Sequence, residues 1–270
     1  MAFFGFNQKP GRGLSREEAS KREYFGILGR KLWQMVQINL LFFVCNIILF
    51  AAIAYMTLPF FVSGNTDFLN YLHELLSGET LLPVIYFVPF MFFGPTNAAI
   101  TYITRNFVKQ EPVFIASDFF AACRKNFFKG LAAGFILTLM HYAYFVAVIF
   151  YINVSENVFL PLVFATMVGF ALSFTSFYVY PIMVTFDLKL RHIFKNAWLM
   201  SFINFPRNLL VFAILAAVHV ALIYYVPFIW APLMVFFLIA FTSYTINFFA
   251  WDAIEKYMIN SEIEKPEDED

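Results

Sequence analysis

Long charge-free stretches alternate with short basic segments along this chain. The charge-free stretches are Leu32–Ser63, Thr80–Thr104, Gly130–Ser155, Asn157–Phe186 and Asn208–Trp251. A helix rises about 1.5 Å per residue, so about 20 apolar residues cross the roughly 30 Å hydrocarbon layer of a bilayer. The last stretch is too long for one crossing, and Pro227 is its natural break. The pattern therefore predicts six transmembrane helices.

Composition supports this interpretation. Of the 270 residues, 61% are hydrophobic and 13% are charged, whereas about 25% of the residues of a soluble domain are charged. The mean hydropathy is +0.71. We therefore expect an all-α, polytopic membrane protein whose first partner is the lipid bilayer.

The distribution of charge predicts the topology. The 18 Lys and Arg residues all fall before the first span, between spans 2 and 3, between spans 4 and 5, or after the last span. Cytoplasmic loops collect Lys and Arg, so both termini are expected in the cytoplasm. The chain then divides into a cytoplasmic segment with an amphipathic helix (1–31), a six-span membrane domain (32–251) and an acidic cytoplasmic tail (252–270).

An amphipathic helix is predicted in the membrane interface before each odd-numbered span, with Ser15 (paired with Glu18) and Ser117 as expected N-caps. The apolar positions recur at helical spacing; they are Tyr24, Phe25, Leu28 and Leu32; then Phe119, Phe120, Cys123 and Phe127; then Leu190, Ile193, Phe194, Ala197 and Trp198. The motif Asn-Phe-x-Lys/Arg-x-Leu begins at Asn126 and again at Asn204, 78 positions later. We interpret the chain as three units, each an interfacial helix followed by a helical hairpin. The alternative is that any six-span protein has basic, amphipathic connectors.

The sequence carries no familiar catalytic signature. No GxGxxG, P-loop, HExxH or GxSxG motif occurs, and Cys45 and Cys123, the only cysteines, form no CxxC pair. We expect no enzyme, no cofactor, no metal site and no nucleic-acid partner. The predicted spans also contain no Asp, Glu, Lys or Arg, which argues against a proton-coupled carrier because such carriers usually hold a carboxylate at membrane depth.

Polar groups inside the spans are neutral or weakly basic. Asn97, His141 and His219 are the best candidates for a polar cavity between helices. The other members of this set are Asn39, Asn46, Ser173, Thr175, Ser176, Thr242, Ser243, Thr245 and Asn247. The alternative is that all of them form interhelical hydrogen bonds, which are common in membrane proteins.

Helix breaks are predicted at Gly94-Pro95 and at Pro181. Proline removes one backbone hydrogen bond, and the preceding glycine loosens the same turn. The freed carbonyls could line a cavity. The alternative for Gly94-Pro95 is a packing kink at which glycine lets a second helix approach.

Several of these segments resemble the YesL family of bacterial membrane proteins. The resemblance runs from Gly29 to Asn260 and is carried by Gly94-Pro95-Thr96-Asn97-Ala98-Ala99, by the Arg105–Glu111 connector, by Asp118-Phe119-Phe120 with Lys125-Asn126-Phe127, and by Tyr180-Pro181 before Leu190–Trp198. The family is a domain of unknown function whose genes often neighbour sugar-importing ABC systems. The resemblance thus implies a location in a bacterial plasma membrane and an accessory role in carbohydrate uptake. It supplies no catalytic or ligand-binding residues.

Two functions therefore compete. One is an accessory component that binds the subunits of an ABC-type carbohydrate importer, and the other is a stand-alone permease or channel for a small solute. An accessory protein should have a tightly filled interior, whereas a permease should have a polar, water-accessible cavity. Either function is compatible with a homo-oligomer.

Overall fold

The computed structural model of the chain describes residues 23–62, 82–154 and 157–260, and every regular element in these residues is a helix. The all-α class is confirmed. The elements are α2 (Tyr24–Cys45), α3 (Ile47–Val62), α5 (Leu82–Val108), α6 (Ile115–Lys125), α7 (Phe127–Val154), α8 (Phe159–Thr185), α9 (Leu190–Ile203), α10 (Phe205–Tyr225), α11 (Pro227–Leu233), η1 (Met234–Leu238), α12 (Ile239–Ile254) and η2 (Glu255–Ile259). The expected cap at Ser15 and most of the acidic tail lie outside the described residues.

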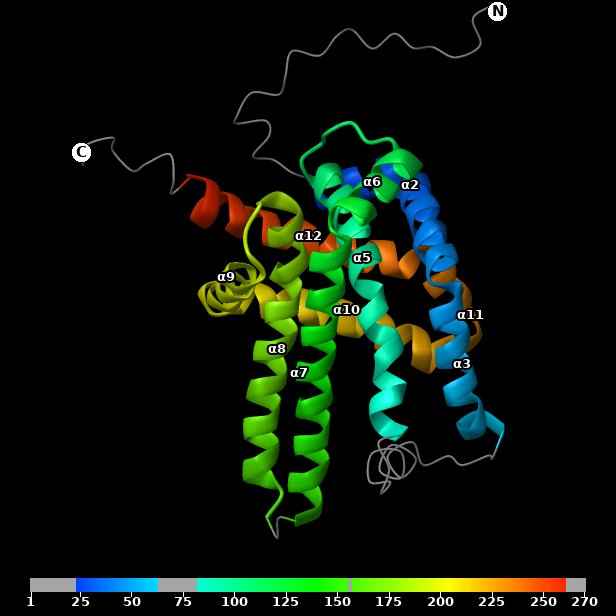
Figure 1. Cartoon of the computed structure of the whole chain (residues 1–270), viewed down its shortest axis with the longest axis vertical. Helices are drawn as coiled ribbons and strands as arrows, with labels where there is room; N and C mark the ends of the chain where they lie inside the picture. The colour runs from blue at the N-terminus through cyan, green and yellow to red at the C-terminus, as the bar shows by residue number, and fades with distance from the viewer. Residues whose placement is uncertain (1–22, 63–81, 155–156, 261–270) are drawn as a thin grey trace, which may run out of the picture.

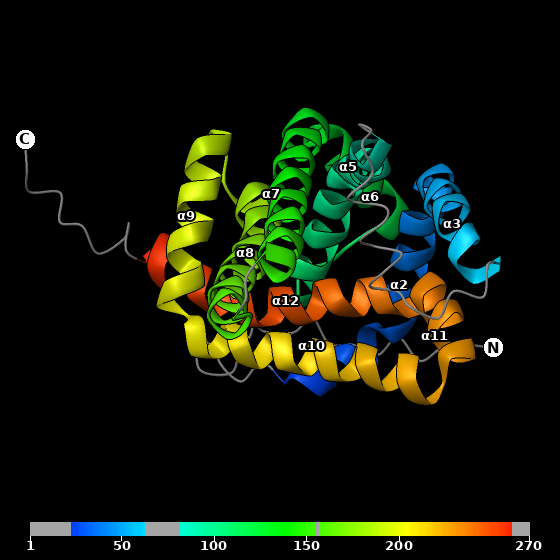
Figure 2. The ribbon, with the colours of Figure 1, turned by 90° about the horizontal axis from the view of Figure 1, so that it is seen from below.

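The helices form two groups that cross each other. Helices α7 and α8 make a long hairpin, α5 packs along α7, and α2 and α3 lie beyond α5 (Figure 1). Helices α10 and α12 lie side by side and run across the first group, as the view from below shows (Figure 2). The expected arrangement as three hairpins, each preceded by an interfacial helix, is therefore not confirmed.

Three helix-to-helix junctions share one construction. Asn46, Asn126 and Asn204 each separate two helices, with φ/ψ of −112°/17°, −103°/16° and −106°/27°. The side-chain amide of Asn46 donates to the Phe42 carbonyl over 2.7 Å, and that of Asn126 donates to the Ala122 carbonyl over 3.0 Å. The same two carbonyls also accept the backbone N–H groups of Asn46 and Asn126, so each asparagine pairs twice with the last turn of the preceding helix. The same junction thus recurs after α2, α6 and α9, and at Asn46 it divides the predicted first span, Leu32–Ser63, into two helices.

Helix boundaries agree with the prediction at the α10–α11 turn and differ at two other places. The break before Pro227 is confirmed. Helix α6 starts before the expected cap Ser117, and the Asp118 carboxylate accepts a hydrogen bond from the Phe114 N–H over 2.8 Å. Helix α5 continues to Val108, so Arg105 belongs to a helix and not to a connector.

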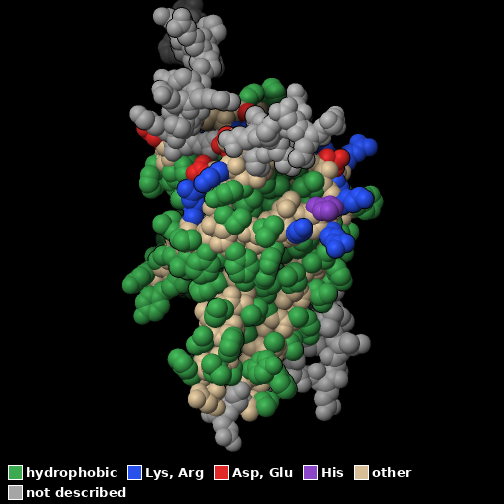
Figure 3. Space-filling model, turned by 90° about the vertical axis from the view of Figure 1, so that its left-hand side faces the viewer, with side chains coloured by type: hydrophobic (Ala, Val, Ile, Leu, Met, Phe, Trp, Pro, Cys, Tyr) green, Lys and Arg blue, Asp and Glu red, His purple; other side chains and the backbone are tan. Residues whose placement is uncertain are grey.

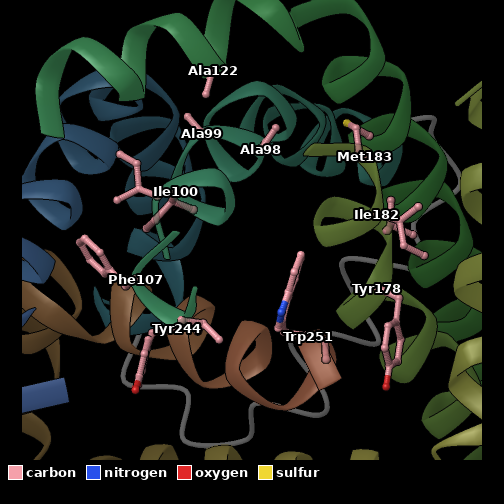
Figure 4. Close-up of a cluster of buried hydrophobic side chains, with 14 of the residues drawn as sticks. Ala98, Ala99, Ile100, Phe107, Ala122, Tyr178, Ile182, Met183, Tyr244 and Trp251 are labelled. Atoms are coloured by element: carbon pink, nitrogen blue, oxygen red, sulfur yellow. The ribbon is translucent and has the colours of Figure 1, made fainter. Parts of the chain in front are cut away.

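The core lies where α5, α6, α8 and α12 meet. Figure 4 shows small side chains of α5 and α6 (Ala98, Ala99 and Ala122) near larger ones of α8 and α12 (Tyr178, Ile182, Met183, Tyr244 and Trp251), all of them buried. Alanines at these positions let helix backbones approach, and the large residues fill the remaining space. The core therefore surrounds the C-terminal half of α5.

Four helical stretches in the described residues are long and apolar enough to cross a membrane: Phe127–Ile152, Phe159–Thr185, Phe205–Tyr225 and Phe228–Ile259. The number rises to five if Tyr24–Cys45 and Ile47–Tyr55, which meet at 66°, form one broken span. Six spans are thus not confirmed. On the face in Figure 3, charged side chains gather toward the upper end and hydrophobic ones cover the lower part. This pattern suits a membrane-embedded protein.

Candidate functional site

Helices α5 and α7 cross in close contact at glycines. A Cβ atom on Gly94 would overlap the backbone carbonyl of Gly130, and a Cβ atom on Gly130 would lie 3.0 Å from the Gly94 carbonyl and from Pro95 Cα. Both contacts are with backbone atoms, which cannot rotate away as a side chain can. Of the two interpretations of Gly94-Pro95, the close helix approach is therefore confirmed.

Pro95 also leaves one backbone carbonyl of α5 without its helical hydrogen-bond donor near this crossing. Because proline has no N–H, the carbonyl of Met91 four residues earlier loses its donor within the helix. A Cβ atom on Gly134 would overlap this same carbonyl oxygen. The Met91 carbonyl thus packs against the backbone of α7. Helix α5 runs through Pro95 and α8 runs through Pro181, so the predicted helix breaks do not occur at these prolines.

One cavity lies between α5, α8, α10 and α12 and has a volume of about 290 Å³. Three predicted candidates line it: Asn97 of α5, Pro181 of α8 and His219 of α10. Its other polar side chains are Thr101, Ser176, Tyr180, Thr242, Ser243 and Asn247. Four helices that are distant in the sequence therefore bring their polar residues to one place.

A second cavity lies between α5, α7 and α8 and has a volume of about 470 Å³. It is lined by His141 and Thr138 of α7 and by Phe90 and Phe93 of α5. Asn97, Ser176 and Tyr180 line both cavities, so these three residues form a shared wall. The side chains of Asn97 and Tyr180 lie close to each other in this wall.

The two histidines make the same local hydrogen bond. His141 Nδ1 lies 2.7 Å from the Leu137 carbonyl oxygen, and His219 Nδ1 lies 2.9 Å from that of Leu215. A carbonyl only accepts, so Nδ1 carries the proton in both rings, and Nε2 of the neutral ring is an acceptor. Each cavity therefore receives one imidazole acceptor.

Neither cavity is lined by an Asp, Glu, Lys or Arg of the described residues. In the same part of the chain, no group of three or more His, Cys, Asp or Glu is placed to hold a metal ion. The lining instead combines amides, hydroxyls, imidazoles and aromatic rings. Such a site can bind an uncharged molecule that has both hydroxyl groups and apolar edges.

Interhelical hydrogen bonding, the alternative for the polar residues in the spans, is confirmed for several of them. Asn247 donates to Thr104 Oγ1 over 2.9 Å, and Thr104 and Ser243 share a hydrogen bond of 2.9 Å. Asn46, between α2 and α3, bonds with Thr96 of α5 over 3.0 Å. These bonds join α12 and α2 to α5, the helix that carries Asn97.

Asn39 holds an irregular segment beside the first cavity. Its amide donates to the carbonyls of Met234 and Val235 over 2.8 and 2.6 Å, and its carbonyl oxygen accepts from the Ala240 N–H over 2.7 Å. The segment is the π-helix η1, and such widened turns are frequent at functional sites. Met234 and Leu238 of η1 line the cavity. Asn39 therefore holds in place the helical segment that forms one side of the cavity.

Arg105 is a second residue whose role the sequence did not reveal. Its side chain is 7% exposed, and its guanidinium donates to the Val184 carbonyl (2.8 Å), to Thr185 Oγ1 (3.1 Å) and to Asn106 Oδ1 (2.8 Å). Val184 and Thr185 end α8, where the helix dipole is negative. Arg105 therefore links the C-terminal end of α8 to α5. These are the two helices whose side chains form the shared wall.

An exposed ion pair joins the start of α7 to the segment after α8. Lys129 Nζ lies 2.6 Å from Asp187 Oδ1. The hydrogen bond and the charge of Lys129 hold the pKa of the Asp187 carboxyl below its usual value. The carboxylate stays ionised at neutral pH, and the pair is lost only when the pH falls through this lowered pKa.

The fold and the site together define a class: a helical protein with several apolar helices that suit a membrane, and with two open cavities whose mostly apolar walls carry neutral polar side chains. Residues 35–154 match a family model described as "Protein of unknown function, DUF624". This match covers the second half of α2 and all of α3, α5, α6 and α7, and supports a family of unknown function. No curated protein and no solved structure matches the chain. The YesL name and the link to carbohydrate import stay predictions.

Proposed function

We propose that this chain is a multi-pass membrane protein that binds and passes a small, uncharged, polyhydroxylated solute. The observation that carries the proposal is the pair of adjacent cavities that meet at Asn97, Ser176 and Tyr180. A tightly filled interior is expected of an accessory protein, and a polar cavity is expected of a permease. The two cavities therefore favour the permease.

The chemistry of the lining narrows the solute class. A charged solute would need a partner of opposite charge in a region of low dielectric constant, and the described lining supplies none. Hydroxyl groups can pair with the side chains of Asn97, Ser176 and Tyr180, while a ring or carbon chain can pack on Phe93 or Phe177. Volumes of about 290 and 470 Å³ are close to the lower end of the usual range for small-molecule sites.

Three six-carbon probes that differ in charge test this proposal. Sorbitol is neutral, gluconate is an anion and glucamine is a cation at pH 7. We expect the purified protein to bind sorbitol in calorimetry and to transport it in liposomes, and we expect no binding of the two charged probes. Equal binding of gluconate or glucamine, or no binding and no uptake of sorbitol, would contradict the proposal.

Asn97→Ala should weaken sorbitol binding by about tenfold, which is the loss expected for one or two hydrogen bonds. Expression and membrane insertion should stay intact, because Asn97 is only partly buried. Thr166→Val, an exposed position near the start of α8, is the matched control and should leave binding unchanged. If Asn97→Ala left the affinity for sorbitol unchanged, the shared wall would not be part of the binding site.

We further propose that the protein lies in a bacterial plasma membrane with six crossings and both termini in the cytoplasm. An even number of crossings keeps all 18 Lys and Arg residues on one side. Helices α10 and α12 would then cross at a large tilt relative to α7 and α8. The turn at Val226 would face the outside.

Cysteine labelling tests this topology in a variant without Cys45 and Cys123. A membrane-impermeant maleimide should label Val226→Cys in intact cells, because this turn residue is exposed. Pro112→Cys, exposed in the α5–α6 connector, should react only after the membrane is permeabilised. If both positions need permeabilisation, α10 and α12 stay on the inner side and the number of crossings is four or fewer.

An accessory role with ABC transporter subunits is our second proposal, and α9 is the observation that favours it. Trp198, Leu199 and Phe202 are exposed on this helix, although they are large and apolar, and basic residues such as Arg191 and Lys195 are exposed on it as well. Such a helix can meet anionic lipid or the cytoplasmic face of a partner. A pull-down from native membranes should then recover transporter subunits, whereas recovery of this chain alone together with sorbitol flux would favour the permease.

A further inference from the structure

The two cavity histidines occupy equivalent positions in the internal repeat. His141 follows the junction residue Asn126 by as many positions as His219 follows Asn204. The carbonyls that bind their Nδ1 atoms belong to Leu137 and Leu215, which are again 78 positions apart. The same residue type, on the same helix of its unit, thus makes the same hydrogen bond twice.

Each of the two equivalent histidines lines one of the two cavities. His219 lines the smaller cavity and His141 the larger one. The wall between them is common to both, so a molecule in either cavity meets the same Asn97, Ser176 and Tyr180 side chains. In the first unit, the position that matches His141 and His219 is Phe61, a residue type that accepts no such hydrogen bond. At this position, therefore, only the second and third units supply an imidazole.

We propose that the cavities are two equivalent binding sites, and that His141 Nε2 and His219 Nε2 are the solute-specific acceptors in them. A hydroxyl group of the solute donates to Nε2 in each site, and a second hydroxyl pairs with the shared wall. The wall then lies between two successive positions of the solute on one path. This inference rests on the proposed function and assigns its two solute positions to particular residues.

Each site has its own prediction. Replacement of His141 or His219 by Phe removes the acceptor and keeps an aromatic ring, so the affinity of that site for sorbitol should fall about tenfold or more. Replacement by Gln supplies a carboxamide oxygen and should restore most of the affinity. His192, exposed on α9 and absent from both linings, is the matched control.

Calorimetry with sorbitol on the full-length protein tests the inference. We expect two sites of similar affinity for the wild type and for His192→Phe. His141→Phe and His219→Phe should each keep one unchanged site and one site weakened about tenfold or more, and the Gln variants should again show two sites of similar affinity. A wild-type stoichiometry of one, or loss of all binding in a single Phe variant whose Gln counterpart is folded, would overturn the two-site inference and leave the proposed function standing. Absence of any sorbitol binding would instead overturn the proposed function and the inference with it.

Modification of histidine by diethyl pyrocarbonate, read by mass spectrometry, gives a second measurement that needs no solute. The reagent is uncharged and crosses the bilayer, so His141 and His219 should both react in vesicles, as should the exposed His192. Sorbitol should protect the two cavity residues and leave His192 reactive. If either cavity histidine stays unmodified while His192 reacts, that cavity is closed to water and the equivalence of the two sites is wrong.

Discussion

Gly94→Ala should prevent stable packing of α5 on α7. The added methyl group would occupy the position of the Gly130 carbonyl, so the two helices would have to move apart. Backbone cannot move as cheaply as a side chain, and overpacking alone costs about 1–3 kcal/mol. We expect a loss of at least about 3 kcal/mol, which corresponds to a fall in Tm of about 10 °C for a chain of this size.

The measurement is the thermal stability of the detergent-solubilised protein. Gly29→Ala is the matched control, because the same substitution on α2 meets no atom within 4 Å. Alanine favours a helix over glycine by up to about 1 kcal/mol, so the Tm of this control should stay constant or rise. If the Tm of Gly94→Ala stayed within about 2 °C of the wild type, the close crossing of α5 and α7 would be wrong.

Local features of this chain were predictable because local physics determines them. The turn before Pro227 follows from the length of the apolar stretch and from the missing proline N–H. The amphipathic segments around Phe119 and Ile193 form helices, because apolar residues recur at helical spacing there. The candidates Asn97, His141, Pro181 and His219 meet around two cavities, since a polar group in an apolar span must face other protein groups.

Other features depend on three-dimensional contacts that no single segment encodes. Hydropathy gives the length of α10 and α12 but not their direction, so their course across the α7–α8 hairpin could not be predicted (Figure 2). Tyr180 was not predicted as a site residue because a tyrosine in an aromatic-rich span resembles its neighbours. Arg105 marked the end of a charge-free stretch and was placed in a loop, although helix α5 continues past it.

The π-helix η1 shows the same limit and leads to the second prediction. Nothing in the sequence Met234–Leu238 distinguishes a widened turn from an ordinary apolar one. The partner that stabilises it, Asn39, lies at the other end of the chain and is fully buried. Asn39→Leu should therefore destabilise the protein by about 3 kcal/mol, because it leaves two carbonyls and one N–H of η1 and α12 without this partner.

The expected fall in Tm is again about 10 °C. Sorbitol binding to the smaller cavity should weaken as well, since Met234 and Leu238 line it. Gln37→Leu, a half-buried polar residue on the same helix, is the control for added apolar volume and should change the Tm by no more than about 3 °C. Equal losses in the two variants would mean that α2 tolerates no leucine there, whereas a loss confined to Asn39→Leu would show that one amide holds the irregular wall of the cavity in place.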